Sequence, residues 1–399
     1  MENTYKIKPL RKTETRRFWK GKKADSYVTS LPMEWVKEYI PDYEKKENRV
    51  IERTQIDSTI LITPQIKEEK PKPLELIMET GNGDQVYYSV ISAYLQDYDD
   101  ICITEKDYNV NLIEKLSSIG DKLPNAYFKG KESDGRYVIK FETKIENIPK
   151  KLDEIYMHYE TLYSKNQKMF SGSIKESDIE TEYKIVTRTE NLVDNNVFAL
   201  KRLFTHVFET FWNKPGILIE SGLLRDEDAV DYTAAYKIAG YRSVANILER
   251  ITDIEKDIFE LLKKLRDSKI ALPQKNGPDF PKYYDGAHDM IKDAYQSKKL
   301  TESASDSKNG FKCLVKVLAA EDNEKDGIRY REKYISFDER KKILDYLKES
   351  KKPPELVALE GLIWGSTGLA TNIAEAWINM SDLTKIDKIK KDSMSKIKS

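Results

Sequence analysis

The chain has 399 residues, of which 39% are hydrophobic and 34% are charged, and its 68 basic side chains equal its 68 acidic ones. This balance gives no general argument for binding to nucleic acid or to a membrane surface. No stretch reaches the roughly 18 apolar residues of a membrane span, and none has the pattern of a signal peptide. The two cysteines, Cys102 and Cys313, lie in apolar segments, which predicts buried, reduced thiols. We therefore expect a soluble, cytoplasmic protein with several domains.

Residues 1–65 predict a small β-rich module, and residues 66–148 predict an α/β connecting segment. The first contains four stretches rich in β-branched or aromatic residues, TYKIKPL, SYVTSL, NRVIERT and STILITP. PMEWVKEYI predicts a short helix among them, since its first turn can hold Pro32. In the connecting segment we expect helices at YYSVISAYLQDY and NVNLIEKLSSI and strands at ICIT, PNAYFKG and RYVIKFET.

From residue 149 onward the apolar pattern follows the helical period. Three long segments predict a three-helix bundle over residues 149–270, and the third carries an apolar seam at alternating three- and four-residue steps, Val244, Ile247, Ile251, Ile254, Ile258, Leu261 and Leu265. The stretch LPQKNGPDFPKYYDG predicts a linker because it has three prolines and two glycines. A second three-helix bundle is expected over residues 282–383. Residues 384–399 form a Lys-rich tail that we expect to be frayed.

Two of the predicted helices each carry a pair of carboxylates four residues apart. Glu190 and Asp194 lie in the second helix, and Glu249 and Asp253 lie in the third, where Asp257 continues the same face. Like charges at this spacing destabilise a helix by roughly 0.2–0.5 kcal/mol. A hard cation would cancel the repulsion, and carboxylates one turn apart suit such an ion. The alternative is that these acids lie on solvated helix faces.

Catalytic motifs are scarce in this sequence. An oxidative di-iron enzyme would carry paired Glu-x-x-His motifs. Of the three histidines, His158, His206 and His288, only His288 follows an acid at this spacing, Asp285. The sequence also lacks a nucleophile elbow, a P-loop and a Rossmann fingerprint. We therefore expect a protein that is not an enzyme.

The segment ERITDIEKDIFE, residues 249–260, resembles the acidic signature of PhoU, the family of phosphate-transport regulators. NIAE at residues 372–375 resembles the end of the same signature, and TENLVDNNVFALKRL resembles the family's other acidic motif. The resemblance implies tandem three-helix bundles with metal clusters on their acidic helices, holding iron, zinc, manganese or magnesium. WGSTG replaces the acidic core in the last helix, so we expect weak metal binding there, although Asp322 and Asp326 keep the four-residue spacing.

The segment RKTETRRFWKGKKADSYVTSLPMEWVKEYI resembles the AbrB-type swapped-hairpin domain. Such hairpins exchange between chains, so the resemblance implies a homodimer. Residues 1–30 hold nine Lys and Arg against three acids, and a basic run of this kind can follow a phosphate backbone. The candidate nucleic-acid contacts are Arg11, Lys12, Arg16, Arg17, Lys20, Lys22 and Lys23. The alternative is a solvated loop or a dimer arm. An AbrB-type module followed by two PhoU repeats is the layout of archaeal PhoU-like proteins.

These resemblances favour a non-enzymatic regulator of phosphate uptake or phosphate signalling that acts by protein docking. Its metal would order the bundle or help to form the docking face, and its partner would be the ATPase of a phosphate transporter or a signalling protein. The second interpretation is an AbrB-type DNA-binding transcription regulator with a metal-sensing helical domain. The third, a metal-dependent enzyme, lacks an identifiable base or nucleophile.

Overall fold

The computed structural model describes residues 51–56, 59–64, 74–78, 83–105, 110–132, 135–211, 214, 216–224, 233–273, 278–301, 304–320, 323–348 and 352–381. The chain divides into two compact units, Met1–Pro71 with Asp226–Ala229, and Lys72–Arg225 with Val230–Ser399. The first two predicted strands, the short helix PMEWVKEYI and the Lys-rich tail lie outside the described residues.

In the first unit, β1 (Ile51–Ile56) and β2 (Thr59–Pro64) form an antiparallel hairpin. Ile56 pairs with Thr59, so only two residues connect the strands. The hairpin confirms strands in NRVIERT and STILITP, whose β-branched residues suit an extended backbone. Two strands do not identify a swapped-hairpin module, so the AbrB-type architecture stays a prediction.

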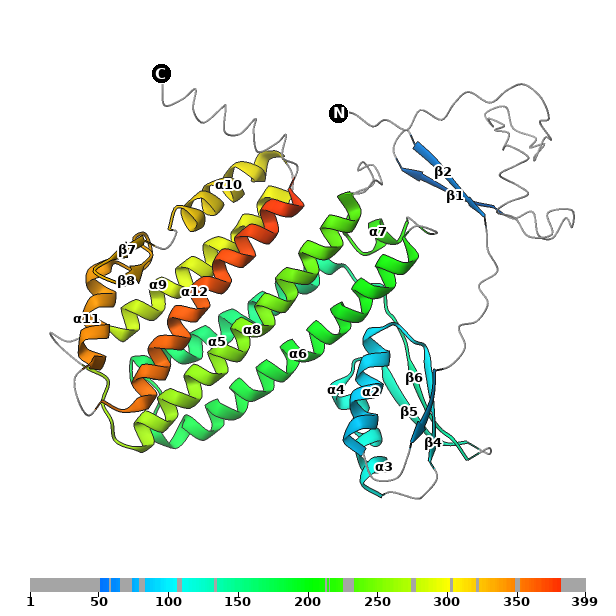
Figure 1. Ribbon diagram of the computed structural model, residues 1–399, viewed down its shortest axis with the longest axis horizontal. Helices are drawn as coiled ribbons and strands as arrows, with labels where there is room; N and C mark the ends of the chain where they lie inside the picture. Colours follow the sequence, from blue (N-terminus) through cyan, green and yellow to red (C-terminus); the bar gives the residue numbers. More distant parts are fainter. Residues whose placement is uncertain are drawn as a thin grey trace, which may run out of the picture. The chain divides into compact units, whose positions relative to one another are not determined.

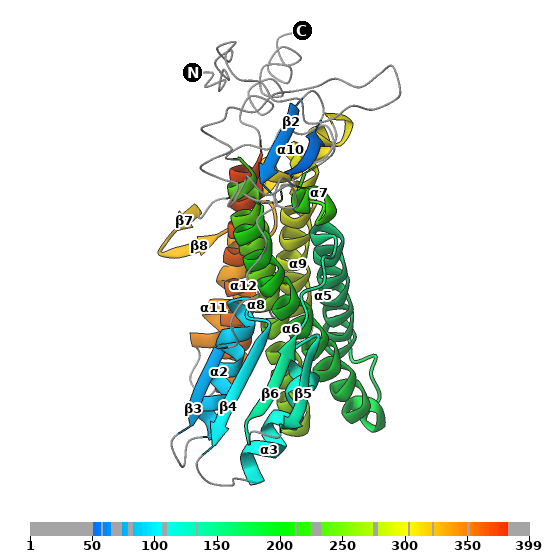
Figure 2. The ribbon, with the colours of Figure 1, turned by 90° about the vertical axis from the view of Figure 1, so that its right-hand side faces the viewer.

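A four-stranded sheet begins the second unit, and helices cover one of its faces (Figures 1 and 2). Its strands lie in the order β3 (Leu74–Met78), β4 (Asp100–Glu105), β6 (Tyr137–Phe141) and β5 (Ala126–Lys131). The helices are α2 (Gly83–Leu95), α3 (Val110–Ser117) and α4 (Ile119–Lys122). β3 and β4 are parallel, as a connection through α2 requires, and β6 is antiparallel to both of its neighbours. The sequence predicted these elements except β3, a short apolar run after the proline-rich connector, and the one-turn helix α4.

Three long helices follow, as the helical period predicted. They are α5 (Ile148–Phe170), α6 (Ile179–Thr210) and α8 (Thr233–Asp267), with the one-turn helices η2 (Glu176–Asp178) and α7 (Ile217–Glu220) between them. The side chain of Asn147 caps α5 by accepting a hydrogen bond from the Lys150 amide. Among the described residues, no helix has the length and apolar character needed to cross a membrane.

The remaining helices are α9 (Phe280–Gln296), η3 (Ser297–Thr301), α10 (Ala304–Leu318), α11 (Phe337–Lys348) and α12 (Pro354–Met380). α9 begins inside the predicted linker because Asp279 caps its first turn and Pro281 occupies that turn, where its missing N–H costs nothing. The helical pattern expected throughout the second predicted bundle is wrong after Leu318, where α10 ends. β7 (Asn323–Lys325) and β8 (Ile328–Tyr330) form a hairpin there.

The helices of both predicted bundles share one hydrophobic core. α8 packs against α5 and α6 and also against α12, and these helices run side by side in Figure 1. A single cluster of buried side chains includes members from α5, α6, α8, α9, α10 and α12, among them Leu152, Val197, Ile251, Met290 and Trp377. A mainly helical fold is therefore confirmed. The helices of the two predicted bundles pack directly against each other.

Arg202 of α6 anchors the α/β segment to the helices. Its side chain is 1% exposed, and its Nη2 lies 3.2 Å from Oδ1 of Asp97. Its Nη1 donates to the backbone oxygens of Tyr94 and Tyr98 at 2.8 and 2.9 Å, and its Nε donates to the Thr143 hydroxyl at 2.7 Å. Four groups of the α/β segment thus depend on one guanidinium.

Alanine substitutions at two helical glycines, Gly286 and Gly365, provide a test of the helix packing. A Cβ at Gly286 of α9 would collide with the backbone oxygen of Tyr334, whereas nothing lies within 4 Å of a Cβ at Gly365 of α12. We expect Gly286→Ala to destabilise the protein by about 1–3 kcal/mol, because backbone must move. Gly365→Ala should stabilise it by roughly 0.5–1 kcal/mol, because glycine weakens a helix interior. Urea unfolding followed by circular dichroism measures both, and a shift of the same sign in both variants would contradict this packing.

Candidate metal site

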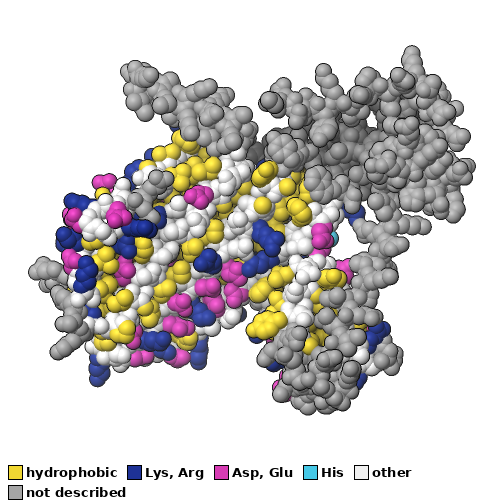
Figure 3. All heavy atoms as spheres, in the orientation of Figure 1, with side chains coloured by type: hydrophobic (Ala, Val, Ile, Leu, Met, Phe, Trp, Pro, Cys, Tyr) yellow, Lys and Arg dark blue, Asp and Glu magenta, His cyan; other side chains and the backbone are white. Residues whose placement is uncertain are grey.

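α6 and α8 bring three of the predicted acids together. Glu190 and Asp194 project from α6, and Asp253 projects from the neighbouring α8. One carboxylate oxygen from each of the three lies within 4.8 Å of the other two. Asp and Glu side chains gather over the middle of α6 and α8 in the space-filling view (Figure 3). We call Glu190, Asp194 and Asp253 the acidic triad.

The helical period places the triad at the edge of the α6–α8 contact. Val193 and Val197 of α6 and Ile251 of α8 are fully buried in the shared core. Glu190 is 9% exposed, Asp194 is half-buried and Asp253 is exposed. The three carboxylates therefore form a group that extends from the helix interface to the solvent, where an ion can reach it.

Burial and repulsion between the carboxylates together raise the pKa of two members of the triad. Burial, together with the charges of Glu190 and Asp253, raises the pKa of Asp194 to about 6. Partial burial and the charges of Glu249 and Glu190 raise the pKa of Asp253. Negative charges that are held close together in this way favour either a proton or a cation in their midst.

Two lysines that sequence reasoning did not identify offset part of this charge. Lys256 Nζ lies 3.2 Å from an oxygen of Glu190, and Lys201 Nζ lies 2.7 Å from an oxygen of Glu249. Both lysines come from the two helices that carry the acids. Glu190, Asp194, Glu249 and Asp253 still outnumber the two lysines, so the group keeps a negative excess.

The other predicted ligands are not part of the triad. Glu249 lies near it and acts on the pKa of Asp194 and Asp253, but its oxygen is engaged by Lys201. Asp257 is exposed one turn further along α8, and its pKa is raised by partial burial and by the charge of Glu260. Both residues remain candidates for a second coordination layer of a larger cluster.

The pair Asp322 and Asp326 was predicted to lie on a helix, and this was wrong for Asp326. Asp326 has φ of 54° and forms the turn of the β7–β8 hairpin with Gly327, whose φ is 73°. An Asp-Gly turn with two positive φ angles matches the twist of a hairpin. Asp322 lies outside the described residues, as do the seven basic residues proposed to contact nucleic acid.

The donor set suits a hard cation. The triad offers only carboxylate oxygens, which are the ligands that magnesium, manganese and calcium prefer, and which ferric iron also accepts. A soft thiolate or an imidazole is absent from the group, so zinc fits it less well. Lys256 would have to release Glu190 before that carboxylate could give both oxygens to an ion.

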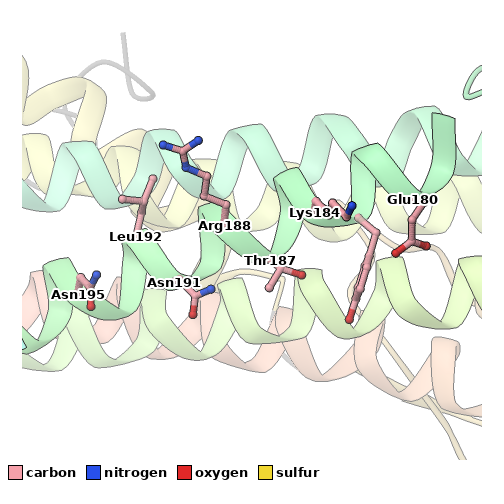
Figure 4. Close-up of a pocket in the computed structure, with 8 residues that line it drawn as sticks. Glu180, Lys184, Thr187, Arg188, Asn191, Leu192 and Asn195 are labelled. Carbon is pink, nitrogen blue, oxygen red and sulfur yellow. The ribbon is translucent and has the colours of Figure 1, made fainter. Parts of the chain in front are cut away.

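An open depression runs along the outer face of α6 next to the triad (Figure 4). Its labelled residues all belong to α6 and include Lys184, Arg188, Asn191 and Leu192, and they follow one side of this helix. None of the triad residues lines it. The depression is therefore an exposed helix face rather than an enclosed site around the acids.

A second polar group lies inside the helical core, and sequence reasoning missed it. Glu255 of α8 is 2% exposed and accepts hydrogen bonds from Tyr284 and from Asn166. Tyr159 is hydrogen-bonded to Nδ1 of His288 at 2.7 Å, and His288 is buried. Glu255 sits between the exposed acids of ERITDIEKDIFE, and only the register of α8 against α5 and α9 turns it inward.

No protein-family model, curated protein or solved structure matches this chain.

Proposed function

We propose that this protein is a non-enzymatic regulator whose helical bundle binds a metal ion at the acidic triad and docks onto a partner protein. The observation that carries this proposal is the convergence of Glu190, Asp194 and Asp253 from two different helices. A cation held there would relieve the repulsion that raises the pKa of Asp194. It would also tie α6 to α8 and so fix the shape of the surface that these helices present.

The biological process is proposed from the sequence resemblance. ERITDIEKDIFE and NIAE resemble the signature of phosphate-transport regulators, which suggests control of phosphate uptake or phosphate signalling. The partner would then be the ATPase of a phosphate transporter or a signalling protein. We propose a cytoplasmic homodimer, because AbrB-type hairpins exchange strands between chains.

DNA binding is the second candidate function. It is favoured by the excess of six positive charges within residues 1–30. Contacts to phosphates release counterions, so DNA binding of this type would weaken steeply as salt is added. Protein docking without DNA binding predicts little affinity for duplex DNA at any salt concentration. Fluorescence anisotropy with a labelled duplex across a salt series separates the two functions.

Metal analysis of the purified protein tests the proposed site. We expect stoichiometric metal in the wild type after reconstitution with Mn²⁺, Mg²⁺ or Fe³⁺, and its loss in a variant that combines Asp194→Asn with Asp253→Asn. Asp267→Asn is the matched control, because Asp267 is an exposed acid at the end of α8 that is not among the proposed ligands. Equal metal content in the double variant and the control would remove the triad from the proposal.

Metal should also raise the stability of the wild type. An ion that binds only the folded state at 100 times its dissociation constant adds about 2.7 kcal/mol to the free energy of unfolding. The double variant should lack this gain, and without metal it should be at least as stable as the wild type because two repelling charges are gone. Thermal unfolding with and without Mn²⁺ measures both effects. A metal-free double variant that is clearly less stable would show that these acids support the fold instead.

A further inference from the structure

A line of aromatic rings crosses the helical core at the contact of α5 with α9. The rings belong in order to Trp377, Tyr295, Tyr156, Tyr159, His288 and Tyr163. Successive ring centroids are separated by 6.3, 4.0, 5.5, 5.6 and 3.5 Å. We call this set the aromatic line. It begins at Trp377, which is 1% exposed, and ends at Tyr163, which is only partly buried.

Every tyrosine in the aromatic line is hydrogen-bonded to a group that can accept its proton. Tyr295 donates to Asp153 at 2.7 Å, and Tyr163 donates to Asp285 at 2.8 Å. Tyr156 donates to Glu160. The partner of Tyr159 is Nδ1 of His288 at 2.7 Å, as described above.

The hydrogen-bonded bases make one-electron oxidation of these tyrosines easier. Loss of one electron turns a phenol into a strong acid, so a buried tyrosine is oxidised readily only where a nearby base takes the proton. Burial lowers the pKa of His288 to about 4, so its imidazole is neutral at pH 7 and Nδ1 can accept from Tyr159. Ring contact between neighbours supplies a short path for the electron.

Trp377 lacks such a base. Its indole Nε1 is buried and has no hydrogen-bond partner among the described residues. An oxidised Trp377 would therefore keep its positive charge inside an apolar core, where a charge is costly. This favours transfer of an electron to Trp377 from its ring neighbour Tyr295.

We propose that the aromatic line is an electron-transfer relay that moves an oxidising equivalent from Trp377 to Tyr163 near the surface. A small oxidising radical in solution, such as the carbonate radical anion, takes one electron from Trp377 and becomes carbonate. Tyr295 restores the electron to Trp377 while passing its phenolic proton to Asp153. Each tyrosine in turn regains its electron and proton as the next one loses them. The last to be oxidised is Tyr163, whose proton goes to Asp285. A thiol or ascorbate in solution then returns one electron, and the proton moves back from Asp285 to the phenolate oxygen.

Flash photoionisation tests the relay in the full chain. The parent protein carries Phe in place of Trp19, Trp35, Trp212 and Trp364, so that light absorbed only by tryptophan oxidises Trp377. We expect the indole radical signal to decay while a tyrosyl radical signal grows. Tyr295→Phe should abolish this growth and prolong the indole radical, although the ring remains in place. Asp153→Asn should slow the growth, because the amide cannot accept the proton.

Tyr283→Phe is the matched control. Tyr283 is another buried tyrosine of α9, and its hydroxyl donates to Glu360 outside the aromatic line. This variant should behave like the parent. The relay is overturned if no tyrosyl radical grows in the parent, or if Tyr295→Phe leaves its growth unchanged. Should the parent fail to fold, a comparison of the tyrosyl radical yield in the wild type and in Trp377→Phe decides the matter, since equal yields exclude the relay.

Discussion

Replacement of Arg202 by leucine is expected to destabilise the protein by about 3–5 kcal/mol, because it breaks a buried ion pair and leaves buried polar groups without their donor. Asp97 would lose its ion pair with the guanidinium and keep only His206 and Thr143 as side-chain partners, and the backbone oxygens of Tyr94 and Tyr98 would lose Nη1 as a donor. The Thr143 hydroxyl would no longer accept from Arg202, although it would still donate to Asp97. Since these groups belong to the α/β segment, we expect this segment to detach from α6 first.

Hydrogen exchange with mass spectrometry measures that order. Peptides from α2 and β6 should gain deuterium in the variant at denaturant concentrations at which α8 is still protected. Arg188→Leu is the matched control, because Arg188 is an exposed residue of the same helix and should change stability little. Uniform loss of protection in all helices, or no loss at all, would contradict the anchoring role of Arg202.

Acid is expected to destabilise the protein through His288, by about 2 kcal/mol at pH 5 and about 3 kcal/mol at pH 4. Burial lowers the pKa of His288 to about 4, whereas an unfolded histidine has an ordinary pKa of about 6.5. The unfolded state therefore binds more protons between these values. The contribution of His288 is fully present above pH 6.5 and is lost as the pH falls towards 4.

His288→Gln isolates this contribution, because many carboxylates also titrate in acid. The free energy of unfolding of the variant should approach that of the wild type, or exceed it, as the pH is lowered from 7.5 to 5. His158→Gln, on α5 and outside the aromatic line, should follow the wild type. Urea unfolding at each pH provides the values. If the difference between His288→Gln and the wild type stays constant with pH, the imidazole is not held neutral by burial.

The helices could be predicted because their apolar residues repeat at the helical period. Val244, Ile251 and Ile258 of the predicted seam are fully buried. The hairpin after α10 was missed because its strands have three residues each, too few for an alternating pattern to stand out. The Asp-Gly dipeptide of its turn was the available signal. The start of α9 was missed because the stretch 272–286 is rich in proline and glycine, which predicts a linker, whereas Pro281 lies in the first turn of the helix, where proline is tolerated.

The candidate site could be predicted in part. A four-residue spacing fixes Glu190 and Asp194 on one side of α6 whatever the tertiary fold. Their approach to Asp253 depends on the rotation of α8 against α6, which the seam indicated only roughly. The same rotation decides which lysines pair with the acids and whether the side chain of Glu255 points inward. A rotation that differs by one residue would change both. Side-chain partners of this kind follow from packing and leave no periodic trace in the sequence.

The shared core has a consequence for how the protein is made. α8 packs against α12, yet the ribosome releases α8 long before it releases Pro354–Met380. In that interval the side of α8 that contacts Ile373 and Trp377 stays uncovered, and such surfaces in a nascent chain invite aggregation. The helices α5, α6 and α8 thus reach their final packing only after α12 has been synthesised. We therefore expect the nascent chain to need a chaperone that shields α8 until then.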